Sequence, residues 1–228
     1  MCNVHIVIPA YNHYELLHNL LWQLNRKEKE NISSILIMDD CSPDEEIEGG
    51  LGWWESSHLF SKFSCKFQSV NAEFLRNAND GILSLVCKYS HDDIGILLST
   101  DVLVYTKFIS QIRDTLLETP KSLIGGVLHS HDTGWNKFGD RLFPYLEGWL
   151  LATTLGNWKE LDYFDDRFAP CDYEDVDLST TAAALGYQLV PLNNVGLVHK
   201  GGGSIGYSPK RLKQTNINKK KFEEKWTK

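Results

Sequence analysis

Residues 94–101 read IGILLSTD, five residues without a polar side chain followed at once by Ser99, Thr100 and Asp101. A short, unbroken apolar run is typical of a strand buried on both faces, as in a parallel sheet. Two earlier stretches end in the same way, VHIVIPAYN at 4–12 and ISSILIMDDCS at 32–42. Ligands of such sheets bind outside the carboxyl ends of the strands. The three polar clusters therefore predict one ligand site at one edge of the sheet.

Helical spacing separates these strands. Leucines recur every three or four residues over 14–25, and the same spacing predicts helices over 73–89 and from Phe108 to Leu116. Another strand is predicted over 123–128. Strands that alternate with helices predict an α/β fold, with a central, mostly parallel sheet flanked by helices.

The second half of the chain is less regular. Glycine, aromatic and polar residues are mixed through 131–170, and a helix is then expected over about 173–185, with Gly186 directly after it. Short strands near 187–198 and a glycine-rich loop at 201–206 complete the predicted elements. Because no linker or internal repeat divides the chain, we expect a single domain.

The composition is that of a globular protein. The 228 residues are 42% hydrophobic and 23% charged, and no apolar run approaches the roughly 18 residues that a membrane-spanning helix needs. Five cysteines without a CxxC pair indicate reduced thiols. The first apolar stretch is too short for a secretory signal. We therefore expect a cytoplasmic protein.

Charge is distributed unevenly along the chain. The net charge is −7, but residues 209–228 contain eight basic and two acidic side chains, a net +6, which leaves −13 for residues 1–208. The acidic body argues against a nucleic-acid-binding surface over most of the molecule. The segment 209–228 is expected to be a basic C-terminal helix or tail. It is either a solvated helix or a contact to an anionic partner, such as the cytoplasmic face of a membrane.

Acidic side chains and one histidine provide the candidate chemistry. Carboxylate oxygens with a histidine suit Mg²⁺ or Mn²⁺, above all an ion that substrate phosphates also hold. Asp101 directly follows its strand, so its side chain belongs at the sheet edge, although a helix cap or turn would also explain an aspartate there. The candidates are Asp39, Asp40, Asp101, Glu174, Asp175, Asp177 and His199.

The order and spacing of several short motifs resemble glycosyltransferase family 2, the inverting, nucleotide-sugar-dependent transferases of the GT-A fold. The motifs are IVIPAYN (6–12), IMDDCS (37–42), RNANDG (76–81), LLSTDV (97–102), FDDRF (164–168), EDVDLS (174–179), VHKGGGS (198–204) and FEEKW (222–226). The resemblance implies a Rossmann-like GT-A domain over 1–208. Residues 1–102 would form its nucleotide-sugar-binding half and residues 103–208 its acceptor and catalytic half.

The resemblance also implies a donor site. An aspartate can accept a hydrogen bond from a base N–H, and an arginine supplies a fixed fork of donors. Asp39 or Asp40 would hold the base, with Arg76 and Asn79 beside the base and ribose. The residues implied for the donor nucleotide are Pro9, Ala10, Tyr11, Asn12, Asp39, Asp40, Arg76, Asn79, Ser99 and Thr100.

The metal-binding DxD element of the family falls on Ser99-Thr100-Asp101, so its first aspartate is a serine here. The resemblance implies that Ser99 meets the ribose and that Asp101 and His199 hold Mn²⁺ or Mg²⁺. Loss of one carboxylate is expected to weaken metal binding. The glycine-rich loop would cover the diphosphate, with Ser204 as a contact.

Glu174 and Asp175 are the implied catalytic pair. Asp175 would be the general base that takes the proton from the acceptor hydroxyl, and Glu174 would position the acceptor together with Trp149. The other interpretation is structural, because acids in the first turn of a helix interact favourably with its dipole and Asp172 could cap that helix.

The expected function is inverting transfer of a sugar from a nucleoside-diphosphate sugar, with UDP as the expected nucleotide. The acceptor would be a hydroxyl of a glycan or lipid-linked oligosaccharide, as in polysaccharide biosynthesis. Two alternatives stay open. One is a catalytically inactive sugar- or nucleotide-binding module of the same fold, which Ser99 makes conceivable. The other is a nucleotidyltransferase, whose glycine-rich, basic loop after the first strand is replaced here by PAYN at 9–12.

Overall fold

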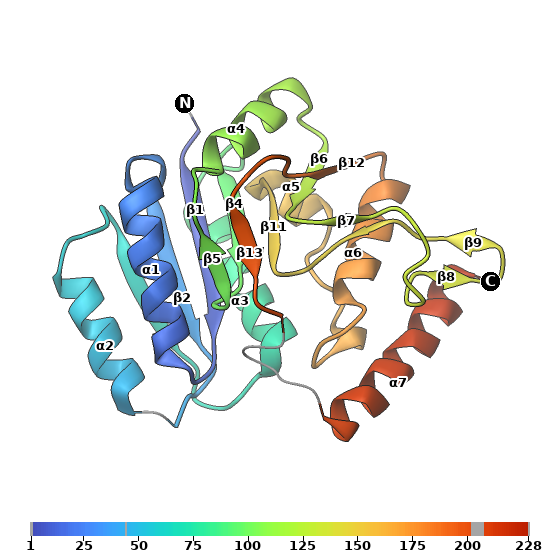
Figure 1. Cartoon of the computed structure of the whole chain (residues 1–228), viewed down its shortest axis with the longest axis horizontal. Helices are drawn as coiled ribbons and strands as arrows, with labels where there is room; N and C mark the ends of the chain where they lie inside the picture. Colours follow the sequence, from blue (N-terminus) through green and yellow to red (C-terminus); the bar gives the residue numbers. More distant parts are fainter. Residues whose placement is uncertain (1, 44, 202–207, 228) are drawn as a thin grey trace.

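The computed structural model describes residues 2–43, 45–201 and 208–227 and has a seven-stranded sheet at its centre (Figure 1). All neighbouring strands of this sheet pair in parallel except β11, which is antiparallel to both β4 and β6. The prediction of a central, mostly parallel sheet is confirmed. The strand order is β12 (Gln188–Pro191), β6 (Ser122–Gly125), β11 (Leu150–Thr154), β4 (Ile94–Leu98), β1 (Val4–Ala10), β2 (Ser34–Asp39) and β3 (Phe63–Phe67).

Helices cover both faces of the sheet, and each face has its own apolar core. Successive side chains of β1 show the division, because Ile6 and Ile8 belong to one core and Val7 to the other. The first core includes side chains of α1 (Tyr14–Glu28), α2 (Glu45–Ser56) and α4 (Ile109–Glu118). The second includes side chains of α3 (Glu73–Lys88), α5 (Leu155–Glu160), α6 (Glu174–Ala184) and α7 (Pro209–Trp226).

Short two-stranded ribbons and two 3₁₀ turns complete the structure. β5 (Val102–Val104) pairs with β13 (Leu197–His199), β7 (Leu128–His129) with β10 (Tyr145–Leu146), and β8 (Lys137–Phe138) with β9 (Arg141–Leu142). The 3₁₀ turns are Lys29–Asn31 and Asp166–Phe168. Within the described residues, no helix is both long and apolar enough to cross a membrane.

One predicted strand is wrong. The structure divides the single strand expected over 123–128 into β6 and β7, with Gly126 between them. A Cβ atom on Gly126 would lie 2.0 Å from the indole ring of Trp149. The chain leaves the sheet where Trp149 packs directly against its backbone.

The carboxyl ends of β1, β2 and β4 meet at the lower edge of the sheet in Figure 1. Two further strands bring residues from later in the chain to this edge. His199 pairs with Val102 in the antiparallel ribbon of β13 and β5, which places it beside Asp101. At the start of β11, the Trp149 carbonyl accepts a hydrogen bond from the Ser99 N–H.

Candidate active site

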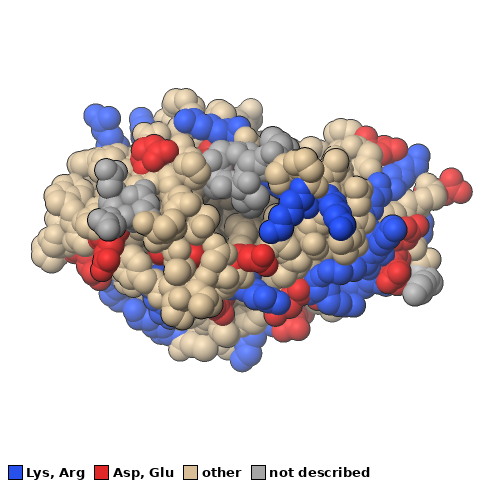
Figure 2. Space-filling model, turned by 90° about the horizontal axis from the view of Figure 1, so that it is seen from below, with Lys and Arg blue, Asp and Glu red and all other residues tan. Residues whose placement is uncertain are grey.

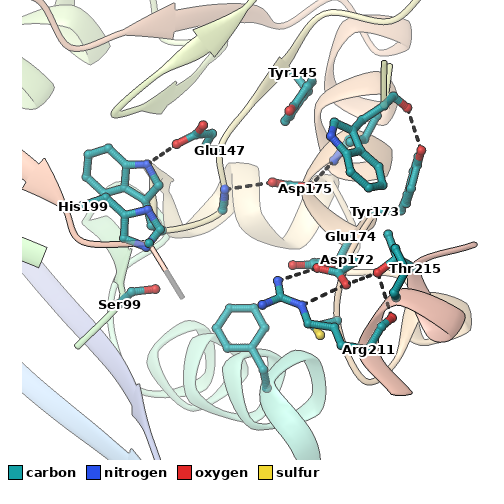
Figure 3. Close-up of a pocket in the computed structure, with 18 of the residues that line it drawn as sticks. Ser99, Tyr145, Glu147, Asp172, Tyr173, Glu174, Asp175, His199, Arg211 and Thr215 are labelled. Carbon is teal, nitrogen blue, oxygen red and sulfur yellow. Dashed lines mark hydrogen bonds and ion pairs between the residues drawn. The ribbon is translucent and has the colours of Figure 1, made fainter. Parts of the chain in front are cut away.

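A cleft of about 870 Å³ opens at this edge (Figure 3). Its walls come from the end of β4, the loop before β11, the N-terminus of α6, the end of β13 and the first turns of α7. Six of the predicted site residues line it together, and they come from both halves of the chain. They are Ser99, Asp101, Trp149, Glu174, Asp175 and His199.

Asp101 and His199 form the candidate metal end of the cleft. The Asp101 carboxylate is 3% exposed, and its Oδ1 lies 3.2 Å from Nε2 of His199. Within the described part of the chain, no three His, Cys, Asp or Glu side chains gather in a way that could hold a metal ion. One carboxylate and one imidazole nevertheless suit an ion that also takes oxygens from a substrate diphosphate. The donor chemistry of this pair therefore fits Mn²⁺ or Mg²⁺.

Trp149 connects the metal end to a second acidic group. Its ring stacks on the His199 imidazole, with centroids 5.4 Å apart and planes inclined by 17°. The indole Nε1 donates a 2.6 Å hydrogen bond to Oε2 of Glu147. The other oxygen of Glu147, Oε1, lies 2.6 Å from Nε2 of His129. Glu147 thus fixes the indole plane that forms one wall of the cleft.

Asp175 lies on the opposite side of the cleft, at the start of α6. Its Oδ2 accepts a 3.0 Å hydrogen bond from the Gly148 N–H, and its Oδ1 accepts one of 2.8 Å from the Val176 N–H. Burial raises the pKa of Asp175 to about 6, and the hydrogen bond from Gly148 opposes that rise. A carboxyl with this pKa is ionised at neutral pH and can still take up a proton.

Glu174 is more deeply placed beside Asp175. Its side chain is 7% exposed, and Oε2 has no hydrogen-bond partner among the described residues. Burial, reinforced by the neighbouring Asp175 charge, raises the pKa of Glu174 well above its usual range. A neutral Glu174 can donate as well as accept a hydrogen bond.

Asp172, considered above as a helix cap, has a different role. The residue that precedes α6 is Tyr173, and no side chain caps the helix there. The Asp172 carboxylate instead forms a two-pronged ion pair with Arg211 of α7, with distances of 2.7 and 3.1 Å, and accepts a 2.6 Å hydrogen bond from Thr215. The capping interpretation of Asp172 is wrong, because α7 takes up this side chain.

The predicted nucleotide residues of β1 and β2 share the same sheet edge but do not line the cleft. Asp39 accepts two hydrogen bonds from Ser42, and the Ser42 hydroxyl accepts one from the Asn12 N–H. The loops that follow the two strands are thereby tied together. Pro9, Ala10 and Thr100 are buried, and the Tyr11 side chain is 40% exposed.

Asp40 is buried and holds the start of α3 through a 2.6 Å hydrogen bond from the Ala72 N–H. Burial raises its pKa. On α3, Arg76 is exposed, whereas Asn79 exchanges hydrogen bonds of 2.8 and 3.0 Å with the Phe164 backbone. The structure does not bring Arg76 or Asn79 to the cleft lining.

Asp177, another candidate, lies apart from the cleft. Asp177 is on the far side of α6, where its carboxylate pairs with Lys225 at 2.8 Å and accepts a 2.7 Å hydrogen bond from Trp226. Its inclusion in one acidic cluster with Asp175 is therefore wrong. Ser204, expected over the diphosphate, falls outside the described residues.

Sequence reasoning missed several residues of the cleft. Glu147, Arg211 and Thr215 line it, as do Trp135 and Tyr145, which were not singled out from among the aromatic residues of 131–170. Glu147 lies two residues before the candidate Trp149, and this proximity was the one available signal. Nothing in the spacing connects Arg211 with Asp172.

The family model of Glycosyl transferase family 2 matches residues 5–187. The chain therefore belongs to glycosyl transferase family 2. Because it belongs to this family, it is a glycosyltransferase by class. No curated protein matches its sequence significantly.

Solved structures share the fold at low identity. The mannosyltransferase PcManGT from Pyrobaculum calidifontis, in complex with GDP-Man and Mn²⁺, is 15% identical with a TM-score of 0.64, over 83% of this chain and 54% of that one. GalNAc-T7 with UDP, GalNAc and Mn²⁺ is 11% identical with a TM-score of 0.71, over 87% and 44%. S. aureus TarS 1-349 with UDP is 14% identical with a TM-score of 0.63, over 85% and 59%.

The chain thus spans about half the length of each of these three proteins. The likeness shows that the chain has the GT-A fold, as the sequence motifs implied.

Proposed function

We propose that this chain transfers a sugar from a nucleoside-diphosphate sugar to an acceptor hydroxyl, with inversion at the sugar C1. One observation supports this most strongly. The buried Asp101 carboxylate and the half-buried His199 imidazole form a pair that lines the same cleft as Asp175, a carboxyl whose pKa is raised to about 6. Asp101 and His199 suit a metal ion that also binds the donor diphosphate. Asp175 suits removal of the proton from the acceptor hydroxyl.

In this reaction Asp175 takes the proton of the acceptor hydroxyl. The acceptor oxygen forms a bond to C1 while the bond from C1 to the diphosphate oxygen breaks on the opposite face, and the nucleoside diphosphate leaves. Asp101 and His199 would hold Mn²⁺ or Mg²⁺, which supplies positive charge to offset the charge on the leaving diphosphate. Both oxygens of Asp175 already accept one backbone N–H, which fixes the carboxylate plane for the transfer.

The acceptor would lie between Glu174 and the Trp149 ring. Glu174 lines the cleft beside Asp175, where it would position the acceptor. Trp149 offers a flat apolar face, held by Glu147, to one side of a sugar ring. These contacts favour a glycan or lipid-linked oligosaccharide as acceptor. UDP stays the expected donor nucleotide, since two of the three compared structures contain UDP and one contains GDP-Man.

The test is nucleotide release from donor sugars. The chain is incubated with Mn²⁺ and UDP-glucose, UDP-N-acetylglucosamine or GDP-mannose, without and with oligosaccharide acceptors, and the free nucleoside diphosphate is measured. We expect release with one donor class, and a loss of 10²-fold or more in Asp175→Asn with unchanged nucleotide binding. Asp114→Asn, an exposed aspartate of α4, is the matched control and should retain full activity.

A catalytically inactive binding module is the second candidate, because Ser99 stands where the family has the first aspartate of its DxD element. The same experiment separates the two. Binding of one nucleotide without release from any donor would support the inactive module and would contradict the proposed transfer.

The outer face of α7 supports peripheral contact with an anionic membrane that carries a lipid-linked acceptor. Lys and Arg side chains gather over this part of the molecule (Figure 2). Lys210, Lys213 and Lys220 form no ion pair with any described residue, and Leu212 and Ile217 beside them are 56% and 40% exposed. Lysines around exposed apolar side chains favour an anionic lipid surface.

Vesicle sedimentation tests this contact. We expect binding to phosphatidylglycerol vesicles, none to phosphatidylcholine vesicles, and weaker binding of the double variant Lys213→Gln/Lys220→Gln. The control is Lys27→Gln/Lys29→Gln at the end of α1, which removes the same charge elsewhere. Equal binding of the two double variants would exclude α7 as the contact surface.

A further inference from the structure

The loop that leads into α6 depends on another part of the chain for its conformation. Asp172 and Tyr173, the two residues before Glu174, have φ values of +72° and +76°. Residues other than glycine rarely adopt this left-handed region, and two in succession are costly. Such a conformation persists only where the surrounding structure fixes it. The start of α6, with Glu174 and Asp175, is therefore held by contacts outside the loop.

The inner face of α7 supplies several of those contacts, alongside single hydrogen bonds to the Trp135 carbonyl from Tyr173 and to the Pro170 carbonyl from Leu75. The side-chain amide of Asn218, which is fully buried, donates to the backbone carbonyls of Phe168, Cys171 and Asp172 at 2.6, 2.9 and 3.0 Å. Three carbonyls surround the amide nitrogen and share its two N–H donors, so the NH₂ end of the amide must face them. Its oxygen accepts a 3.1 Å hydrogen bond from Gln214.

Further side chains of α7 hold the loop and α6 on both sides of Asn218. Gln214 donates to the Ala169 carbonyl at 3.3 Å, and Arg211 holds the Asp172 carboxylate. Closer to the C-terminus, Lys225 pairs with Asp177 on the far side of α6. The inner face of α7 thus binds the segment 168–177 at both ends, and the outer face is left with the lysines described above.

We propose that α7, which lies beyond the residues matched by the family model, positions the catalytic start of α6, and that Asn218 is its central positioning residue. Asn218 touches neither substrate nor the reacting atoms. It acts through the Phe168–Asp172 backbone, which fixes where Glu174 and Asp175 enter the cleft. The inference rests on the proposed function, because it assigns α7 to the same site.

Asn218→Ala removes the three hydrogen bonds and is compared with Asn216→Ala, an exposed asparagine on the outer face of the same helix. The donor that wild-type protein turns over is used at saturation, with Mn²⁺. We expect kcat to fall about 10- to 100-fold in Asn218→Ala, because a small misplacement of a catalytic group is enough for such a loss. The Kd of the nucleoside diphosphate with Mn²⁺ should stay within about twofold of wild type, and Asn216→Ala should match wild type in both.

Hydrogen exchange gives a readout that does not need turnover. In Asn218→Ala, the amides of residues 172–178 should exchange faster while those of β1 and β4 keep their protection. If wild-type protein releases no nucleotide from any donor, the proposed transfer fails, and the exchange data alone decide whether α7 positions α6.

Unchanged kcat together with unchanged exchange over 172–178 in Asn218→Ala would overturn the inference. If Asn218→Ala does not fold, Gln214→Ala decides instead. This milder change removes the hydrogen bonds to the Ala169 carbonyl and to the Asn218 oxygen. It should lower kcat about two- to fivefold and speed exchange over the same residues, and the absence of both effects would equally overturn the inference.

Discussion

Asp175 combines two properties that a general base needs. Two backbone N–H groups fix its carboxylate, and burial raises its pKa to about 6. Gly148 allows the close approach, since a Cβ atom there would lie 3.3 Å from the Asp175 Cβ. The position of this one carboxyl therefore depends on a glycine from the loop before β11, a contact between residues 27 positions apart.

The raised pKa predicts how activity depends on pH. Asp175 accepts a proton only when it is ionised, so kcat/KM should be half-maximal near pH 6 and fall about tenfold for each further unit towards acid. Initial rates of nucleotide release between pH 4.5 and 8, with nucleotide binding followed in parallel, measure this. A profile that is flat down to pH 5 would show that Asp175 is not the base.

Ser99 gives a second prediction about a single residue. Ser99 and Asp101 both line the cleft, so Ser99→Asp would add a carboxylate beside the Asp101–His199 pair. We expect Mn²⁺ in the presence of UDP to bind about tenfold more tightly, which corresponds to roughly 1.4 kcal/mol. Electron paramagnetic resonance of free Mn²⁺ measures this. Ser56→Asp on α2 adds the same charge away from the cleft, and an equal effect there would exclude a local cause.

Among the elements, α7 has two different faces. Phe222 is fully buried against Phe138, Phe143 and Tyr173, whereas Ile217 on the outer face is 40% exposed. The basic sequence of this segment therefore has two explanations. Arg211 and Lys225 form ion pairs with the body of the protein, whereas the proposed membrane contact would use the lysines of the outer face.

The buried face of α7 predicts a stability difference along one helix. Phe222→Ala should lower the free energy of unfolding by about 3–5 kcal/mol, because it leaves a cavity in a packed aromatic cluster. Ile217→Ala should change it by less than about 1 kcal/mol. Urea unfolding followed by circular dichroism compares the two variants. Similar losses would mean that α7 does not dock as described.

The sequence predicted elements best where periodicity was strong. The helices over 14–25 and 73–89 correspond to α1 and α3, and residues 94–98 form β4 as predicted. β11 was missed although it lies between β4 and β6, because its residues fall in the irregular stretch 131–170 and its antiparallel direction has no local signal. α2 and β3 were missed as well.

The candidate site was predictable where motifs carried it. Asp101, His199 and Asp175 came from short motifs and do line one cleft. The contacts that hold the loop before α6 could not be predicted from motifs. A pair such as Arg211 and Asp172 joins distant parts of the chain without any shared spacing. Asp177 shows the opposite error, since three acids in four positions look like one cluster although the Asp177 carboxylate pairs with Lys225 of α7 and does not line the cleft.

At the scale of the whole molecule, the cleft depends on both halves of the chain and on α7. The first half contributes Ser99 and Asp101 at the end of β4, and the second half contributes His199 and the acidic start of α6. The body of residues 1–208 carries a net charge of −13, so a diphosphate approaching it needs a local positive charge. A divalent cation at Asp101 and His199 would supply that charge.

The most direct test of this account is calorimetric titration with UDP, GDP and TDP, each with Mn²⁺ and with EDTA, on wild-type protein and on Asp101→Asn. The account predicts tight binding of one nucleotide that requires Mn²⁺ and that drops at least tenfold in Asp101→Asn, with Asp114→Asn unchanged. Binding that is indifferent to Mn²⁺ and to Asp101, or no binding of any of the three nucleotides, would contradict it.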